Sequence, residues 1–331
     1  MLRYIAFRLV NLVLTIWVAV TAVFIIMRFI PTDPIEAMIG KLNQQSSGMS
    51  EFQMNTLRES LSVSFGLEGT ILEQYFTFLV RNFITFDYGP SLSAFPTTVN
   101  ELIGRALPWT IGLLATSTII GWLLGNFIGL FAGVFPNRRA SRIAETIAIV
   151  LYPIPYYIVA LTLGILFSNV WQVFPISFSL RGEPWTLQFL GSAIYNSILP
   201  SVSILVGIMG WWIISMKALS GVARDEEYVR FAYLRNVPER RILSHYIFRN
   251  TLLPQITILA IQISLIFSGS VLTEILFQYP GVGLLLLRAV GEGDYNMMMS
   301  IITMSIIAVA IATFLVDMAL PLLDPRIRYS K

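Results

Sequence analysis

Six long apolar stretches constrain the fold of this chain more than any other feature of its sequence. They cover residues 5–30, 107–135, 143–168, 194–216, 253–275 and 297–320. A helix of about 20 apolar residues crosses the hydrocarbon core of a bilayer, where only helices and closed barrels satisfy every backbone polar group. The chain is 56% hydrophobic and 12% charged, whereas typical globular proteins are about 25% charged. The sequence therefore predicts an all-α polytopic membrane protein with six transmembrane helices.

The distribution of basic residues predicts the orientation in the membrane. Most of the 22 Lys and Arg residues lie in the N-terminus, between the second and third spans, in residues 217–254 and in the C-terminal tail. Because basic loops are retained in the cytoplasm, we expect both termini on the cytoplasmic side. The first apolar stretch is too long for the core of a signal peptide, and no small-residue cleavage site follows it. We therefore interpret residues 1–31 as a retained first transmembrane helix.

Residues 32–101 form the one long polar stretch of the chain. Acidic residues outnumber basic residues in it, which favours the extracytoplasmic side. Residues 53–61 and 71–84 have helical patterns, but too few apolar residues are available for a separate core. The stretch is therefore predicted to be a small helical extracytoplasmic segment that packs on the membrane part.

The most charged segment, residues 217–254, lies between the fourth and fifth spans and is called the basic loop below. Asp225, Glu226 and Glu227 suit the first turn of a helix, where negative charge meets the positive end of the helix dipole. Asn236 suits the left-handed conformation that ends a helix, and Pro238 suits the first turn of the next one. The pattern predicts two short amphipathic helices at the membrane surface. Their charge alone fits either anionic lipid headgroups or a protein partner.

Within the basic loop, Glu227-Tyr228-Val229-Arg230 is followed by Ala232, and Leu253-Pro254 comes at its end. These residues resemble the EAA loop of binding-protein-dependent ABC transporter permeases of the dipeptide/oligopeptide branch, although Asn236 stands where that family usually has Gly. The resemblance implies that the loop seats in an ATPase subunit and carries ATP-driven motion into the membrane. The residues assigned to ATPase coupling are Asp225, Glu227, Tyr228, Val229, Arg230, Ala232, Asn236, Pro238 and Arg241. Tyr228 and Val229 are expected to supply apolar anchoring, and Asn236 and Pro238 to shape the bend.

The same resemblance extends over most of the chain. Residues 86–91 with Pro96-Thr97, residues 277–283, Asp294-Tyr295 and residues 324–329 are similar to family motifs, and so is the opening at residues 30–34. Residues 32–85 match least. The resemblance implies a type I ABC importer permease fold, in which residues 102–331 form a five-helix core that carries the cytoplasmic coupling loop, residues 217–254.

Four glycines recur at every fourth position of the second span: Gly121, Gly125, Gly129 and Gly133. A stripe of small residues lets helix backbones approach each other closely. The stripe fits helix packing within this subunit, or contact with a second permease subunit.

Three residues are assigned to the translocation pathway. Pro153 and Pro155 lie inside the third span and predict a kink or a broken helix, which either lines the pathway or serves packing. Glu274, near the outer end of the fifth span, is assigned with them, and a local bond is the alternative. Glu145, just inside the third span, is expected to pair with one of the Arg residues in the turn at residues 138–142.

Several kinds of chemistry are missing from the sequence. No phosphate-binding loop G-x-x-x-x-G-K-[ST] occurs, so the chain does not bind ATP through that motif. There is no Cys and a single His, His245, which excludes thiolate zinc sites and multi-histidine metal sites. We find no catalytic constellation. We therefore expect no metal or cofactor on this chain, with ATP and Mg²⁺ bound by partner subunits.

The resemblance also implies partners and a location. The partners are a second homologous permease subunit that completes a heterodimer, two cytoplasmic ATPase subunits, an extracytoplasmic solute-binding protein and membrane lipid, with no nucleic acid. The chain is expected to be a multi-pass subunit of the inner, or cytoplasmic, membrane of a prokaryote, and not itself an enzyme.

The implied function is ATP-driven import of di- and oligopeptides that the solute-binding protein delivers. Members of the family also carry oligosaccharides and nickel, and these substrates remain alternatives. An ATP-independent secondary transporter is the competing class; it predicts internal repeats and ionisable groups at the midplane. A membrane enzyme would need paired carboxylates or His clusters at mid-depth. None of these features is clear in the sequence.

Overall fold

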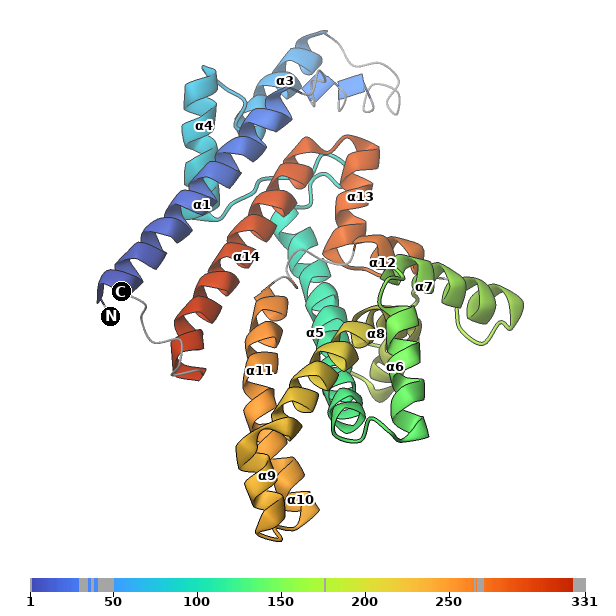
Figure 1. The fold of residues 1–331 in the computed structure, drawn as a ribbon. Helices are drawn as coiled ribbons and strands as arrows, with labels where there is room; N and C mark the ends of the chain where they lie inside the picture. The colour runs from blue at the N-terminus through green and yellow to red at the C-terminus, as the bar shows by residue number, and fades with distance from the viewer. Residues whose placement is uncertain are drawn as a thin grey trace. The chain divides into compact units, whose positions relative to one another are not determined.

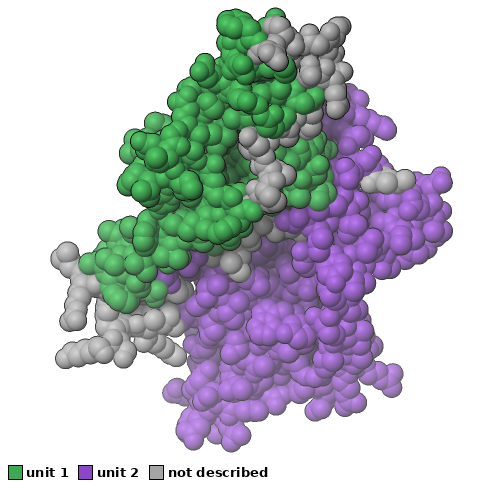
Figure 2. Space-filling view, turned by 90° about the horizontal axis from the view of Figure 1, so that it is seen from above, with its two compact units in different colours: residues 1–110, 280–311 green, residues 111–279, 312–331 purple. Residues whose placement is uncertain are grey.

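The computed structural model describes residues 2–29, 35, 36, 39, 40, 51–175, 177–264, 266 and 271–323. Apart from an isolated bridge between Pro90 and Thr98, the regular structure of these residues is helical. The chain divides into two compact units (Figure 2). Unit 1 comprises residues 1–110 and 280–311, and unit 2 comprises residues 111–279 and 312–331.

Among the described residues, four helices are long and apolar enough to cross a membrane. They are Ile5–Arg28, Val99–Val134, Leu187–Asp225 and Tyr295–Ala319. A pair of helices bent by 98°, Arg139–Leu151 with Tyr156–Val170, makes a fifth candidate if it counts as one span. The prediction of an all-helical protein with several spans is confirmed. The predicted span at residues 253–275 includes positions outside the described residues, so these give four or five spans rather than six.

Unit 1 is built from helices at both ends of the sequence. It contains α1 (Leu2–Arg28), α3 (Glu51–Phe65), α4 (Ile71–Val80), the π-helical turn η1 (Arg81–Thr85), α13 (Val282–Glu292) and the first parts of α5 (Val99–Val134) and α14 (Tyr295–Leu323). Val20 and Phe24 of α1 pack against Phe78 of α4. The Thr21 hydroxyl oxygen of α1 lies 2.6 Å from that of Tyr75 in α4. Consequently α4 lies along α1 (Figure 1), as expected for a segment with too few apolar residues for its own core.

A capping box begins α4. The Glu73 amide donates to the Thr70 hydroxyl at 3.4 Å, and the Thr70 amide donates to the Glu73 carboxylate at 2.7 Å. Two amides at the helix start are thereby satisfied. The hydrogen bonds from the backbone and side chain of Thr70 hold the pKa of Glu73 below its ordinary value. The helices predicted at residues 53–61 and 71–84 are confirmed, with η1 as the last turn of the second.

Unit 2 carries the remaining helices. They are α6 (Arg139–Leu151), α7 (Tyr156–Leu163), the π-helical η2 (Gly164–Val170), α8 (Leu187–Asp225), α9 (Glu227–Leu234), α10 (Glu239–Arg241), the π-helical η3 (Ile242–Phe248), α11 (Arg249–Ser264) and α12 (Val271–Leu276), with the rest of α5 and α14.

The glycine stripe of α5 lies against α8. A Cβ atom on Gly121 would lie 2.8 Å from the Ile208 side chain, and one on Gly129 would lie 2.6 Å from the Ile213 carbonyl oxygen. Gly125 faces Trp212 and Gly133 faces Ser220 in the same way. Side chains at these positions would push the two helices apart, so the glycines set the close approach of α5 to α8 within this chain.

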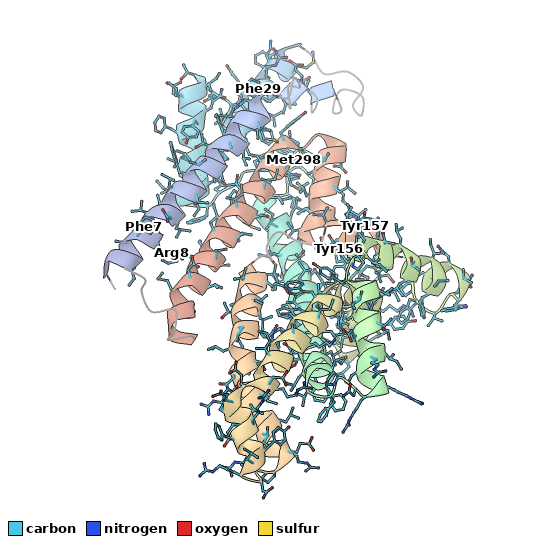
Figure 3. All side chains as sticks on the ribbon, viewed as in Figure 1. Phe7, Arg8, Phe29, Tyr156, Tyr157 and Met298 are labelled. Carbon is cyan, nitrogen blue, oxygen red and sulfur yellow. The ribbon has the colours of Figure 1, made fainter. Side chains whose placement is uncertain are left out.

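The third predicted span is broken at its two prolines. α6 ends at Leu151, α7 begins at Tyr156, and Pro153 and Pro155 lie between them. A Cβ atom on Gly207 of α8 would lie 2.6 Å from Tyr156 Cβ, so α7 starts directly against α8. Figure 3 labels Tyr156 beside Tyr157, whose ring is turned 84° to it. The broken helix predicted from the prolines is confirmed.

Candidate functional site

The basic loop joins the end of α8 to the start of α11 (Figure 1). α8 continues to Asp225, and the chain turns at Glu226, which has an extended backbone. This corrects the prediction that Asp225, Glu226 and Glu227 share the first turn of one helix. The reason is tertiary: Gly133 of α5 packs against α8 at Ser220, beyond the predicted end of the fourth span.

The first helix of the loop, α9, ends as its sequence predicts. Asn236 adopts the left-handed conformation with φ +53°. The Asn236 amide donates to the Tyr233 carbonyl oxygen at 3.0 Å, and the Val237 amide donates to the Ala232 carbonyl oxygen at 3.1 Å. This pair of hydrogen bonds is the Schellman motif, which satisfies carbonyl groups at a helix end.

The second half of the loop is not a separate short helix. Pro238 precedes α10, and α10, η3 and α11 then follow one another without a break from residue 239 to residue 264. Pro254, at the predicted start of the fifth span, is accommodated inside α11. The second arm of the loop and the start of the fifth predicted span form one continuous helical rod.

A small apolar core lies inside the loop. Val229 has no exposed surface and Ala232 is 3% exposed, and both pack with Ile242 and Ile247 of η3 and with Met216 of α8. The expected anchoring role of Val229 is therefore corrected. Val229 and Ala232 hold α9 against η3 and are not available to a partner.

Tyr228 is tied to the base of the loop although its surface is 39% exposed. Its hydroxyl donates to the Tyr246 carbonyl oxygen at 3.3 Å and accepts from Asn250 Nδ2 at 3.1 Å. These bonds join the start of α9 to the start of α11.

The exposed face of α9 carries two large apolar side chains that the sequence interpretation missed. Phe231 is 62% exposed and Leu234 is 78% exposed. The sequence did contain a sign of this pair, because residues three apart lie on the same side of a helix. Phe231 and Leu234 therefore share the face of α9 that does not carry Val229 and Ala232. Other exposed residues of the basic loop include Asp225, Glu227, Arg230, Arg235, Asn236, Pro238, Arg240 and Arg241. We call this surface, centred on Phe231 and Leu234, the loop face.

Glu145 of α6 has a different partner from the expected one. It pairs with Lys217 of α8 and not with an Arg of the turn at residues 138–142. In that turn, the Arg138 guanidinium lies over the rings of Phe131 and Phe135, at 5.3 and 4.3 Å from their centroids. The ion pair links α6 to α8 at the start of the basic loop.

Of the residues assigned to the pathway, Glu274 lies in α12 and is fully buried. Its carbonyl oxygen accepts a hydrogen bond from the Tyr279 amide at 2.8 Å. Pro153 and Pro155 lie at the break between α6 and α7.

Two of the family-like motifs meet in unit 1. Asp294 is buried and accepts hydrogen bonds from Ser91 and Ser93, while Asn296 Nδ2 donates to the carbonyl oxygens of Tyr88 and Pro90. The segment before α5 is thereby fixed to the start of α14. The motifs at residues 30–34 and 324–329 lie outside the described residues.

The described residues offer no group of three or more His, Cys, Asp or Glu side chains that could hold a metal ion. The loop face presents two exposed apolar side chains, Phe231 and Leu234, in a loop whose exposed residues are both acidic and basic.

Comparison with known proteins gives a consistent set of similarities. The profile of the family described as "Binding-protein-dependent transport system inner membrane component" matches residues 125–329. The dipeptide transport system permease protein DppB of Bacillus subtilis is 28% identical over 100% of this chain and 99% of its own length. A putative peptide permease protein of Brucella ovis is 28% identical over 99% of both chains. The glutathione transport system permease protein GsiC of Escherichia coli K12 is 26% identical over 99% of this chain and 100% of its own.

Proposed function

Because this chain belongs to the family of binding-protein-dependent transport system inner membrane components, we propose that it is the peptide-carrying permease of an ATP-driven ABC importer whose basic loop is the coupling loop. The observation that carries the proposal is the loop face. Phe231 and Leu234 are exposed on a helix whose other side is fully buried in the same chain.

Six spans account for the whole chain in this proposal. They are α1, α5, the broken pair α6 and α7, α8, the stretch from α11 to α12, and α14. An even number of spans puts both termini on one side, and the basic residues favour the cytoplasm for that side. α3 and α4 then belong to the extracytoplasmic segment, residues 32–101, and α9 projects into the cytoplasm.

The loop face has the chemistry of a docking surface for a protein. Two neighbouring apolar side chains fill a cleft on the partner and exclude water from it. Arg230, Arg235 and Arg241 around them are suited to carboxylates of an ATPase subunit, since a guanidinium binds a carboxylate through two parallel hydrogen bonds. The core of Val229 and Ala232 makes α9 rigid, so that displacement of the loop face moves α8 and α11 rather than bending the loop.

The transporter needs further subunits. A binding-protein-dependent system implies a solute-binding protein and an energy source beside the membrane component. We assign ATP and Mg²⁺ to two ATPase subunits, and the second half of the pathway to a homologous permease that forms a heterodimer with this chain. The broken pair α6 and α7 contributes irregular backbone, and Glu274 an ionisable group, to the region of the pathway.

Peptides are the substrate class that we favour. The relatives that match over nearly the whole chain are named for dipeptides, peptides and glutathione, itself a short peptide. Oligosaccharides and nickel are the alternatives that the test below separates.

The test is uptake into proteoliposomes that contain the complete transporter with its binding protein. Labelled dipeptide, oligosaccharide and Ni²⁺ are offered with and without ATP. We compare the wild type with Phe231→Ser/Leu234→Ser, and with Phe52→Ser as control, because Phe52 is 80% exposed on α3 in the extracytoplasmic segment. We expect ATP-dependent peptide uptake that the loop-face variant loses and the control keeps. Uptake without ATPase subunits, or full uptake by the loop-face variant, contradicts the proposal.

A further inference from the structure

Among the described side chains of α11, only Thr251 and Gln255 are buried, and both are polar. The Thr251 hydroxyl donates to carbonyl oxygens of its own helical rod, at residues 247 and 248. Gln255 is therefore the buried side chain of α11 that reaches another helix.

Gln255 joins α11 to both α8 and α5. Its Nε2 donates to Ser215 Oγ of α8 at 2.9 Å, and its backbone oxygen accepts from Trp122 Nε1 of α5 at 3.2 Å. The Trp122 backbone oxygen in turn accepts from Asn126 Nδ2 at 2.8 Å. We call Trp122, Asn126, Trp212, Ser215 and Gln255 the polar junction.

Three buried atoms of the polar junction have no hydrogen-bond partner among the described residues. They are two acceptors, Gln255 Oε1 and Asn126 Oδ1, and one donor, Trp212 Nε1. Buried polar groups are nearly always paired, and the preference is stronger at membrane depth. The junction thus holds a donor and an acceptor that are complementary but unused in this arrangement.

Trp212 is the other polar side chain of the junction on α8. Trp212 and Ser215 are three residues apart on α8 and therefore lie on one face of that helix. The indole is held in place, because Gly125 of α5 packs directly against Trp212. Gln255 Oε1 and Trp212 Nε1 are thus an acceptor on α11 and a donor on α8, both without a partner among the described residues.

A groove of about 500 Å³ opens between the end of α8 and the starts of α9 and α11. It is lined by Ala218, Leu219, Val222, Ala223, Glu226, Tyr228, Asn250 and Thr251. The two helices are bridged by the Ser215–Gln255 hydrogen bond just beyond this groove.

We propose that Gln255 is a positioning residue that switches between Ser215 and Trp212 when the coupling loop displaces α11. The inference rests on the proposed function, because the coupling loop supplies the displacement. The rod from residue 239 to residue 264 transmits it, since Val229 and Ala232 of α9 pack on η3 of this rod and no break separates η3 from Gln255. In the arrangement described here Gln255 Nε2 donates to Ser215; in the other, Trp212 Nε1 donates to Gln255 Oε1. Two discrete pairings give α11 two defined positions against α8.

The test uses the complete transporter in proteoliposomes. The variants are Gln255→Leu, Trp212→Phe and the double variant. Gln262→Leu is the matched control, because Gln262 is a partly exposed Gln of the same helix. Dipeptide uptake and ATP hydrolysis are measured on the same preparation, and their ratio is compared after equal assembly and thermal stability have been verified.

A hydrogen bond present in one of two states shifts their ratio by about tenfold when it is lost. We expect the uptake per ATP hydrolysed to fall by about that factor in Trp212→Phe, which loses the hydrogen bond of one state only. Gln255→Leu loses both pairings, so adding Trp212→Phe to it should change the ratio no further. Trp212→Phe keeps the ring that packs on Gly125, so it decides the question if Gln255→Leu does not assemble. Two results in a preparation whose wild type is coupled would overturn the switch. One is an unchanged ratio of uptake to ATP hydrolysis in Trp212→Phe, and the other is additive losses in the double variant. A wild type that takes up peptide without ATP refutes the proposed function and this inference together.

Discussion

Asp294 Oδ2 accepts a hydrogen bond from Ser91 Oγ at 2.5 Å, although the two residues are 203 positions apart in the sequence. The same oxygen accepts from the amide and the hydroxyl of Ser93, and Oδ1 accepts from the Met297 amide in the first turn of α14. One buried carboxylate therefore caps α14 and fixes the segment that leads into α5. The cap of α14 and the attachment of the segment before α5 both depend on this carboxylate.

Replacement of Asp294 should destabilise unit 1 strongly. Asp294→Ala deprives Ser91 and Ser93 of their shared carboxylate acceptor and removes the cap of α14, which together cost at least about 2 kcal/mol of unfolding free energy. Ser91→Ala removes one donor and should cost less. Thermal unfolding in detergent measures both, with Glu59→Ala on the exposed face of α3 as control. Equal stability of Asp294→Ala and the control would contradict the capping role.

The glycine stripe predicts a contrast within one helix. Gly129→Ala places a Cβ atom 2.6 Å from the Ile213 carbonyl oxygen, whereas a Cβ atom on Gly112 of the same helix would meet no atom of the described residues within 4 Å. We expect Gly129→Ala to lower the unfolding free energy by about 1–3 kcal/mol through overpacking. Gly112→Ala should be neutral or slightly stabilising, because Ala favours a helix over Gly. The melting temperatures of the two variants measure this contrast. A similar change at both positions would mean that α5 does not pack this way on α8.

Asn236 should tolerate Gly and reject β-branched residues. Its φ of +53° is accessible to Gly without strain and is costly for Val, by about 1–2 kcal/mol. Asn236→Gly should therefore keep wild-type coupling of ATP hydrolysis to uptake, and Asn236→Val should weaken it by loosening the turn. Limited proteolysis at the basic loop provides an independent readout, and greater cleavage of Asn236→Gly than of Asn236→Val would contradict the assignment.

Substitutions at Val229 and Phe231 should have different effects, the first on the stability of the basic loop and the second on its binding to the ATPase. Val229→Ser removes a fully buried apolar side chain and should cost about 2 kcal/mol, seen as faster cleavage of the loop by trypsin. Phe231→Ser changes an exposed side chain and should leave cleavage unchanged while it lowers ATPase binding. The opposite pattern would return Val229 to the docking surface and place Phe231 in the core.

The sequence was sufficient for the features that depend on neighbouring residues. Apolar length predicted spans, the two prolines predicted the break between α6 and α7, and the type of residue 236 predicted a left-handed helix end. Each of these follows from the local chemistry of the chain.

The features that were missed depend on distant contacts. α9 has two apolar faces, one with Val229 and one with Phe231, and only its packing on η3 decides which is buried. The close contact of Gly133 with α8 extends that helix past its predicted end. Lys217 competes with the Arg residues for Glu145 because α6 and α8 lie together. Similarly, the two motifs joined by Ser91 and Asp294 could each be noticed in the sequence, but not their contact.

The central claim is that the loop face contacts an ATPase subunit in the cytoplasm, and the absence of Cys from the chain makes a direct measurement simple. A single-cysteine Phe231→Cys variant in intact cells is treated with a membrane-impermeant thiol reagent, and then, in inverted vesicles, with a bifunctional cross-linker. The proposal predicts no labelling from outside the cell and a cross-linked product that contains the ATPase subunit. Labelling of Phe231→Cys from the outside, or no product with the ATPase in coupled vesicles, would contradict it.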